Sequence, residues 1–391
     1  MQKMGLYSCC MWLLCLQFSL PALAESAIPS VQLPGGGRMP MSGMGLCCRP
    51  TAATPAVVQE IAEFIKLGGR HLDGAINYGN TKLIGEAIRN VVSSGVRREE
   101  IFFTTKIEPE MFGSEVTKQT MGYIMHESQL RYVDLVLLHM PASFSGEELR
   151  RCGTYRECRR QAWRALEELQ SLGTIKHIGV SNFGIRHLQE VLEYARSPIA
   201  VNQIEYHPWV PATHHAVVDW CHAHGIVVTA YASLGSPMTT YTKKTAPDLK
   251  TTLERIGGVA ERHKRPWQQV VLRWAIQHNV TVIPGTGNVA HMTLNLDLFD
   301  WTLSSEDMAV MDSVPEALPK VVQEPPCDHA QQAERGVTFA HFVLDAAPEG
   351  LSVAGLAFPE QEPRPLAVVG VVAVALAICC WWRKPKRAKT S

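Results

Sequence analysis

The sequence predicts an α/β protein with a closed (β/α)8 TIM barrel, and three observations lead to this fold. Short apolar segments of strand length alternate with amphipathic segments of helix length from about residue 39 to about residue 312. Strands that alternate with helices indicate a parallel sheet. Eight strand candidates occur, and eight such units over this length favour a closed barrel over an open sheet.

The predicted strands are short apolar runs that are separated by segments with helical spacing. They cover residues 39–45, 70–73, 101–105, 133–139, 175–180, 200–204, 226–230 and 280–283. The clearest helix lies in TPAVVQEIAEFIKLGG, where Thr54 is placed to cap the helix and Pro55 occupies its first position. Gly68 and Gly69 end it.

Residues 1–24 predict a secretory signal peptide. One lysine precedes an apolar run, and residues 22–24 (ALA) form a small-x-small pattern for cleavage before Glu25. An uncleaved anchor is the alternative. Cleavage is favoured because the apolar part is short and is interrupted by Gln17 and Pro21.

Residues 366–382 predict a single C-terminal transmembrane helix, because they form an uncharged run near the short limit for a span. Trp381 and Trp382 are placed as interfacial anchors, and residues 383–391 form a basic tail that the positive-inside rule assigns to the cytosol. A removable lipid-anchor signal is the alternative, but the basic tail argues against it. Residues 316–365 are rich in Pro, Gln, Glu and Ala and are interpreted as a stalk.

The two ends together predict a single-pass membrane protein of the secretory pathway. The barrel, residues 25–315, would then lie in the lumen or outside the cell, and we expect it to be monomeric. Asn279 begins a sequon that can be glycosylated in that topology. Cys152 and Cys158 can close a small loop in an oxidising lumen, although their spacing alone does not settle the pairing.

The composition excludes several kinds of partner. The chain has 37 basic and 37 acidic residues, so no overall field attracts nucleic acid. The interior contains no basic patch interleaved with aromatic residues, and nucleic acid is therefore not an expected partner. The cysteines show no C-x-x-C spacing, so no metal site is expected.

Four titratable residues fall at the C-terminal ends of predicted strands, where barrel enzymes carry their chemistry. Asp73 closes the second strand, Lys106 follows the third, and His139 closes the fourth. Tyr78 lies in the loop after Asp73. Side chains from three consecutive strands are therefore expected to converge on one rim of the barrel.

These residue types suit the protonation of a carbonyl oxygen. A tyrosine with an ordinary pKa of ~10 is a weak acid at neutral pH. We expect Lys106 to lower the pKa of Tyr78, and Asp73 to hold Lys106 in place. His139 can donate a hydrogen bond to a substrate oxygen. The set contains no nucleophile, so the attacking hydride must come from a cofactor.

Over nearly all of residues 31–312, the sequence resembles the aldo-keto reductases. GGRHLDGAINYGN is similar to the Asp-to-Tyr segment of that family, TTK to its lysine segment, and DLVLLHMP to its histidine segment. The resemblance implies a catalytic tetrad that reduces aldehydes or ketones, with Tyr78 as the general acid. The tetrad consists of Asp73, Tyr78, Lys106 and His139.

The resemblance also implies a nicotinamide cofactor. Ser181 and Asn182 in IGVSNF, and Gln203 in VNQIEYHP, match residues that hold the carboxamide group. Tyr231 in AYASLGS matches the residue that stacks on the nicotinamide ring. The residues implied for the pyrophosphate are Leu234, Gly235 and Ser236.

Relatives that prefer NADPH usually carry a lysine directly after the eighth strand and an arginine a few residues later. Here Gly285 stands at the lysine position and His291 at the arginine position. Thr286 remains for the 2′-phosphate and Asn295 for the adenine, and backbone amides at the next helix start can also bind phosphate. We therefore predict NADPH with a modest preference over NADH, which grows when His291 is protonated.

Three departures concern the substrate pocket. Gly74 replaces the usual Thr or Ser, Met140 replaces the usual Trp, and residues 46–48 (LCC) replace a Thr and an aromatic residue. The pocket is thus expected to differ, and the carbonyl substrate is not defined. The alternative function is a non-catalytic barrel that reports redox state to a membrane partner, but the presence of all four tetrad residues favours an enzyme.

Overall fold

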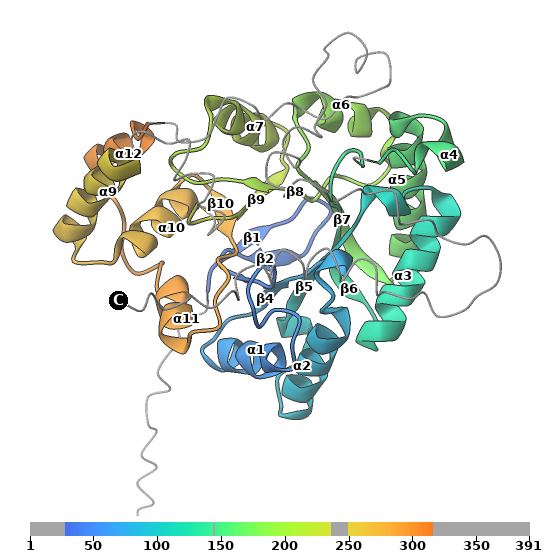
Figure 1. Ribbon diagram of the computed structural model, residues 1–391, viewed down its shortest axis with the longest axis horizontal. Coiled ribbons are helices and arrows are strands. Elements are labelled where there is room, and N and C mark those ends of the chain that lie inside the picture. The colour runs from blue at the N-terminus through green and yellow to red at the C-terminus, as the bar shows by residue number, and fades with distance from the viewer. Residues whose placement is uncertain (1–27, 144, 236–248, 316–391) are drawn as a thin grey trace, which may run out of the picture.

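The computed structural model describes residues 28–143, 145–235 and 249–315, and these form a parallel barrel surrounded by helices (Figure 1). Each of eight strands pairs in parallel with the next along the chain. A parallel bridge between Ser42 and Val282 joins the last strand to the first and closes the sheet. The predicted (β/α)8 barrel is therefore confirmed. The strands are β3 (Met44–Gly45), β4 (His71–Asp73), β5 (Phe102–Ile107), β6 (Val133–Leu138), β7 (Ile175–Ser181), β8 (Val201–Glu205), β9 (Val227–Tyr231) and β10 (Val280–Val282).

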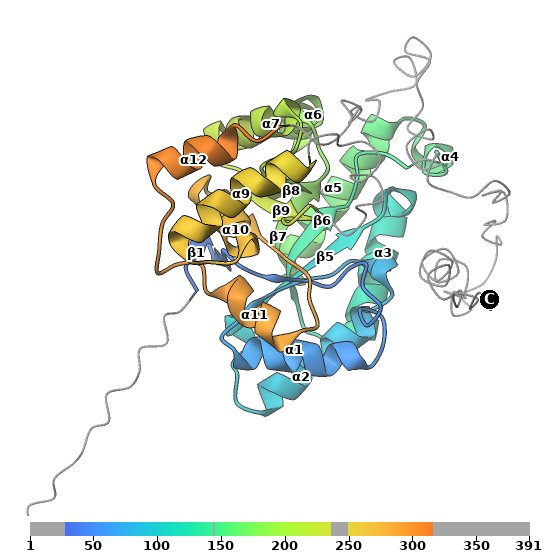
Figure 2. The ribbon, with the colours of Figure 1, turned by 60° about the vertical axis from the view of Figure 1, so that its left-hand side comes forward.

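Helices cover the outside of the barrel, and α9 and α12 lie side by side in both views (Figure 2). The helices are α1 (Ala56–Lys66), α2 (Thr81–Ser93), α3 (Ser114–Ser128), α4 (Leu149–Cys152), α5 (Tyr155–Ser171), α6 (Ile185–Tyr194), α7 (Ala212–Ala223), α9 (Leu249–His263), α10 (Trp267–Gln277), α11 (Val289–Leu296) and α12 (Ser305–Asp312). Three short 3₁₀ turns are η1 (Ile76–Tyr78), η2 (Arg98–Glu100) and η3 (Pro109–Met111).

Helix α1 shows how the pattern sets the packing. Its buried residues recur at helical spacing and face the core. Gly68, with a φ of 96°, follows its C-terminus and ends it as predicted, because glycine adopts this conformation readily. The predicted side-chain cap is wrong: the Thr54 hydroxyl donates to the Thr51 carbonyl at 3.0 Å and does not bond a helix amide.

The first predicted strand, residues 39–45, is wrong as a single unit. Arg38–Pro40 forms β2, which pairs antiparallel with β1 (Ser30–Gln32), and only Met44–Gly45 enters the barrel. Pro40 has no amide hydrogen for a sheet, so the run breaks there. The hairpin buries Leu33 and Met39 against the first residues of several barrel strands. It thereby covers the N-terminal end of the barrel and leaves the C-terminal end for a site.

The predicted ends of the chain lie outside the described residues. These are the signal peptide 1–24, the stalk 316–365, the transmembrane helix 366–382 and the tail 383–391. In the part of the chain that the structure describes, no helix has the length and apolarity needed to cross a membrane.

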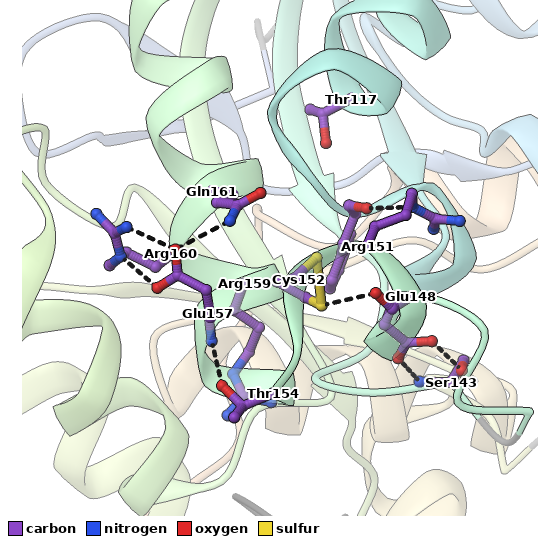
Figure 3. Close-up of a disulfide and its surroundings, with 12 residues drawn as sticks. Thr117, Ser143, Glu148, Arg151, Cys152, Thr154, Glu157, Arg159, Arg160 and Gln161 are labelled. Carbon is purple, nitrogen blue, oxygen red and sulfur yellow. Dashed lines mark hydrogen bonds and ion pairs between the residues drawn. A yellow bond between two sulfur atoms is a disulfide. The ribbon is translucent and has the colours of Figure 1, made fainter.

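A disulfide joins Cys152 at the end of α4 to Cys158 in the first turns of α5 (Figure 3). The segment between them turns through Gly153, and Thr154 then caps α5 by accepting a hydrogen bond from the Glu157 amide at 3.1 Å. The small loop that Cys152 and Cys158 were expected to be able to close is therefore present as a disulfide-bonded loop.

Buried charges also brace the same region. The buried Glu148 carboxylate accepts hydrogen bonds from both the amide and the hydroxyl of Ser143 (Figure 3). Arg159 forms a two-point ion pair with Glu190, at 2.9 and 2.6 Å, and donates to the Pro141 carbonyl at 2.6 Å. The Arg159 bonds thus connect the loop that follows β6 with α5 and α6, and the Glu148 bonds brace the loop internally.

Candidate active site

A buried ion pair forms the base of the site at the C-terminal end of the barrel. Asp73 ends β4 and Lys106 lies in β5, and the Lys106 Nζ is 2.6 Å from the Asp73 Oδ1. The Lys106 side chain is 0% exposed and that of Asp73 is 4% exposed. The same Nζ donates to the Gly74 carbonyl at 2.9 Å and to the Tyr78 hydroxyl at 3.3 Å. Three of the four predicted residues therefore form one hydrogen-bonded chain.

His139, the first residue after β6, completes the group. Its ring meets the Tyr78 ring edge to face, with the centroids 5.9 Å apart. Its Nδ1 is hydrogen-bonded to the carboxylate of Glu108, which directly follows β5. The structure thus brings all four predicted residues together. It adds Glu108, which the sequence analysis missed although its place two residues after Lys106 puts it at the same rim.

Burial and charge act in opposite directions on Tyr78. Burial raises the pKa of the Tyr78 phenol above its ordinary value of 10.0, and nearby Asp73 and Glu108 act in the same direction, while Lys106 lowers it. Lys106 thus lowers the pKa of Tyr78 as expected, but burial outweighs its effect and the net pKa is raised. Tyr78 remains a protonated phenol at neutral pH, which is the form that can donate a proton.

Lys106 keeps its charge despite complete burial. Burial alone lowers the pKa of its ammonium group, but the interactions with Asp73 and Tyr78 outweigh this effect and raise it overall. The pair therefore places a fixed positive charge beside the Tyr78 hydroxyl. Such a charge stabilises the phenolate that remains after proton transfer.

Asn182 lies just beyond β7 in a left-handed conformation, with a φ of 62°, which asparagine tolerates better than most residues. Its Nδ2 donates to the His139 carbonyl at 3.0 Å and to the Ser181 hydroxyl at 3.1 Å. Its Oδ1 accepts from the Tyr231 hydroxyl at 2.8 Å. These predicted cofactor residues are thus gathered at the ends of β7 and β9.

Gln203 of β8 connects the predicted cofactor residues with the tetrad. Its Nε2 donates to the Asp73 Oδ2 at 2.7 Å, and its backbone carbonyl accepts from the Ser181 hydroxyl at 2.9 Å. Within the described residues, its Oε1 accepts no hydrogen bond. The Gln203 Oε1 can therefore accept a hydrogen bond from the amide of a ligand.

The predicted pyrophosphate residues follow β9, and the structure describes two of the three. A β-carbon on Gly235, which has a φ of 72°, would collide with the Trp209 ring. The position therefore requires glycine. Leu234 precedes it in the same turn, and Ser236 lies outside the described residues.

The predicted phosphate-binding segment surrounds the start of α11. The Asn288 side chain accepts hydrogen bonds from the Ala290 and His291 amides, at 2.9 and 3.2 Å. Asn288 thus caps the start of α11 and supplies these two amides with an acceptor within the protein. The Thr286 hydroxyl accepts from the Asn288 amide at 3.1 Å, the His291 side chain is exposed, and Asn295 is buried.

Two of the sequence departures have a structural account. A β-carbon on Gly74 would lie 2.8 Å from the Ile84 Cδ1, so a larger residue here would require the end of that side chain to shift. In the loop after β3, adjacent Cys47 and Cys48 are joined by a disulfide. The preceding residue, Leu46, donates its amide to the Asp73 carbonyl at 2.9 Å, so this loop lies beside the tetrad.

Comparison with known proteins agrees with this geometry. A model of the aldo/keto reductase family matches residues 50–316. "Aldo-keto reductase family 1 member A1" from Mus musculus is 34% identical over 296 residues, covering 73% of this chain and 89% of the relative. An NAD(P)H-dependent D-xylose reductase from Candida tropicalis is 33% identical over 298 residues, covering 72% and 90%.

A solved structure also indicates similarity to aldo-keto reductases. The crystal structure of an aldo-keto reductase complexed with NADPH is similar with a TM-score of 0.66 and 28% identity, covering 75% of this chain and 89% of that one. The barrel and its rim define an NAD(P)H-dependent oxidoreductase. The chain belongs to the aldo-keto reductase family.

Proposed function

We propose that this protein reduces aldehydes or ketones to alcohols with NADPH, and that Tyr78 is the general acid. The observation that carries this proposal is the hydrogen-bonded chain from Asp73 through Lys106 to Tyr78, with His139 beside it. Such an arrangement delivers a proton to an oxygen atom at one defined point of the rim.

The rim residues fit a nicotinamide cofactor. The Gln203 Oε1 is available to accept from the carboxamide, and the Asn182 amide lies beside it on the neighbouring strand end. When bound, NADPH supplies the hydride that adds to the carbonyl carbon. The NADPH complex of a similar structure supports this choice of cofactor, and the name of the Candida tropicalis relative supports a nicotinamide cofactor in general.

In the proposed step, Tyr78 gives its proton to the carbonyl oxygen as the carbon is reduced. Lys106 stabilises the resulting phenolate from 3.3 Å, and Asp73 keeps the ammonium group in place. The test is a screen of aliphatic, aromatic and sugar carbonyls with purified full-length protein. Tight NADPH binding without turnover of any carbonyl would favour the redox-sensing alternative instead.

We predict that kcat/KM is about 10-fold higher with NADPH than with NADH. This factor corresponds to the free energy of about one charge-assisted hydrogen bond to the 2′-phosphate. Gly285 offers no cation for the 2′-phosphate, so the preference depends on Thr286 and His291. The measurement is kcat/KM for both cofactors.

His291→Gln is the matched variant for this prediction, and it should reduce the preference for NADPH without altering the tetrad. An unchanged preference in this variant would show that His291 does not contact the phosphate. A preference for NADH would contradict the choice of cofactor.

We further propose that the protein is a single-pass membrane protein of the secretory pathway, with the barrel on the lumenal side. The sequence of residues 1–24 and 366–382 supports this. Asn279 is exposed in the turn between α10 and β10, where a glycan can be carried. In intact microsomes, protease should leave the barrel undigested, and detergent should abolish that protection. Digestion of the barrel without detergent would contradict the topology.

A further inference from the structure

Glu108 is an acidic side chain beside the tetrad that the proposed proton transfer does not use. It lies directly after β5, and its carboxylate is bonded to the Nδ1 of His139. The exposed fractions are small, 14% for the His139 side chain and 17% for that of Glu108. A charge-assisted hydrogen bond withdrawn from water is stronger than a surface ion pair.

The pairing determines which ring nitrogen of His139 carries a proton. An ionised carboxylate only accepts hydrogen bonds, so Nδ1 must be the donor to Glu108. In a neutral ring, Nε2 then has a lone pair and cannot donate. In a charged ring, Nε2 carries a second proton and can donate. Because Nδ1 is bonded to Glu108, only a ring with a proton on both nitrogens can donate to a substrate oxygen.

The groups packed around this pair come from four elements. From η1, Tyr78 approaches edge to face and stays neutral, because burial raises its pKa. From β5, Lys106 directs its charge to Asp73 in β4. From η3, Glu110 adds an acid whose pKa is raised to about 7, mainly by burial.

We propose that Glu108 is a positioning residue that holds His139 with a proton on each ring nitrogen, so that Nε2 donates a hydrogen bond to the carbonyl oxygen. This inference rests on the proposed function. The proposal adds no proton or electron to the reaction. The hydride adds to the carbonyl carbon, the proton of Tyr78 goes to the oxygen, and His139 keeps both of its protons. Glu108 therefore acts through His139 and does not touch the substrate oxygen.

The first test is a double-mutant cycle. Glu108→Gln keeps an acceptor for Nδ1 but removes the charge, and kcat for carbonyl reduction should fall by about 10- to 100-fold with cofactor affinity unchanged. In a His139→Gln background, the same substitution should cost less than about 2-fold, because Glu108 acts through that ring. Full additivity of the two losses would overturn the proposal.

Glu110→Gln is the matched control, since it removes an acid two residues away. Within the described part of the chain, no hydrogen bond or ion pair joins the Glu110 carboxylate to the tetrad. Its kcat should stay within about 2-fold of wild type. A loss as large as that of Glu108→Gln would show that general acidity at the rim, and not contact with His139, is responsible.

The second test does not depend on turnover. Heteronuclear NMR of the histidine ring nitrogens in the full chain, with His139 assigned from its loss in His139→Gln, should show two protonated nitrogens near neutral pH. Glu108→Gln should show one. A neutral His139 in wild type would overturn the inference even in an active reductase. A charged His139 in a protein without reductase activity would instead refute the proposed function and leave the pairing intact.

Discussion

Replacing Tyr78 by phenylalanine is expected to reduce carbonyl turnover by about 10²- to 10⁴-fold, the usual contribution of a general acid. Phenylalanine keeps the ring that packs against His139 and lies 4.9 Å from the Lys106 Nζ. It removes only the hydroxyl group that Lys106 contacts at 3.3 Å. Cofactor affinity should therefore be nearly unchanged. Steady-state kinetics and fluorescence titration with NADPH measure the two quantities.

The loss should be similar at neutral and mildly alkaline pH. Because burial raises the pKa of Tyr78 above 10.0, the acid form that donates the proton persists throughout this range in the wild type. Tyr123→Phe on α3 is the matched control, because that tyrosine lies on a helix outside the barrel. A Tyr78→Phe enzyme within a few-fold of wild type would show that another group supplies the proton.

Replacing Lys106 by methionine should abolish turnover and lower the free energy of unfolding by about 3–5 kcal/mol. The substitution leaves the Asp73 carboxylate buried with Gln203 as its remaining side-chain donor. An uncompensated charge in the interior is much more costly than a lost surface ion pair. Equilibrium unfolding in urea measures the change.

A second substitution separates stability from chemistry. Adding Asp73→Asn to Lys106→Met removes the unpaired charge, so the double variant should regain much of the stability and none of the activity. Lys82→Met, an exposed position on α2, should change the unfolding free energy by less than about 0.5 kcal/mol. A single Lys106→Met variant as stable as wild type would contradict the burial of the pair.

The order of strands and helices was predictable because each barrel strand is a short apolar run with clear limits. The prediction was wrong at residues 39–45, where Pro40 divides one apolar run into a hairpin strand and a barrel strand. It was also wrong at Thr54, because a threonine at a helix start has several local acceptors and bonded the Thr51 carbonyl. Such competing local bonds are decided by backbone geometry, which a sequence pattern does not contain.

In the site, the positions of Asp73, Lys106 and His139 followed from strand ends alone. Glu108 did not, because a glutamate in a loop is usually solvated, and only the pairing of β5 with β6 brings it to His139. The direction of the Tyr78 pKa shift was missed for a related reason. A sequence can indicate which charges are near, but it does not give the depth of burial that outweighs them here.

The anchored loop after β6 has an evolutionary consequence. Its start is held through the Pro141 carbonyl and its end through the disulfide at Cys158, while the Glu148 carboxylate binds Ser143 within the loop. None of these bonds uses a tetrad side chain. Loops on a barrel tolerate sequence change better than the strands that carry them. Mutations within this loop can therefore accumulate while the tetrad keeps its position.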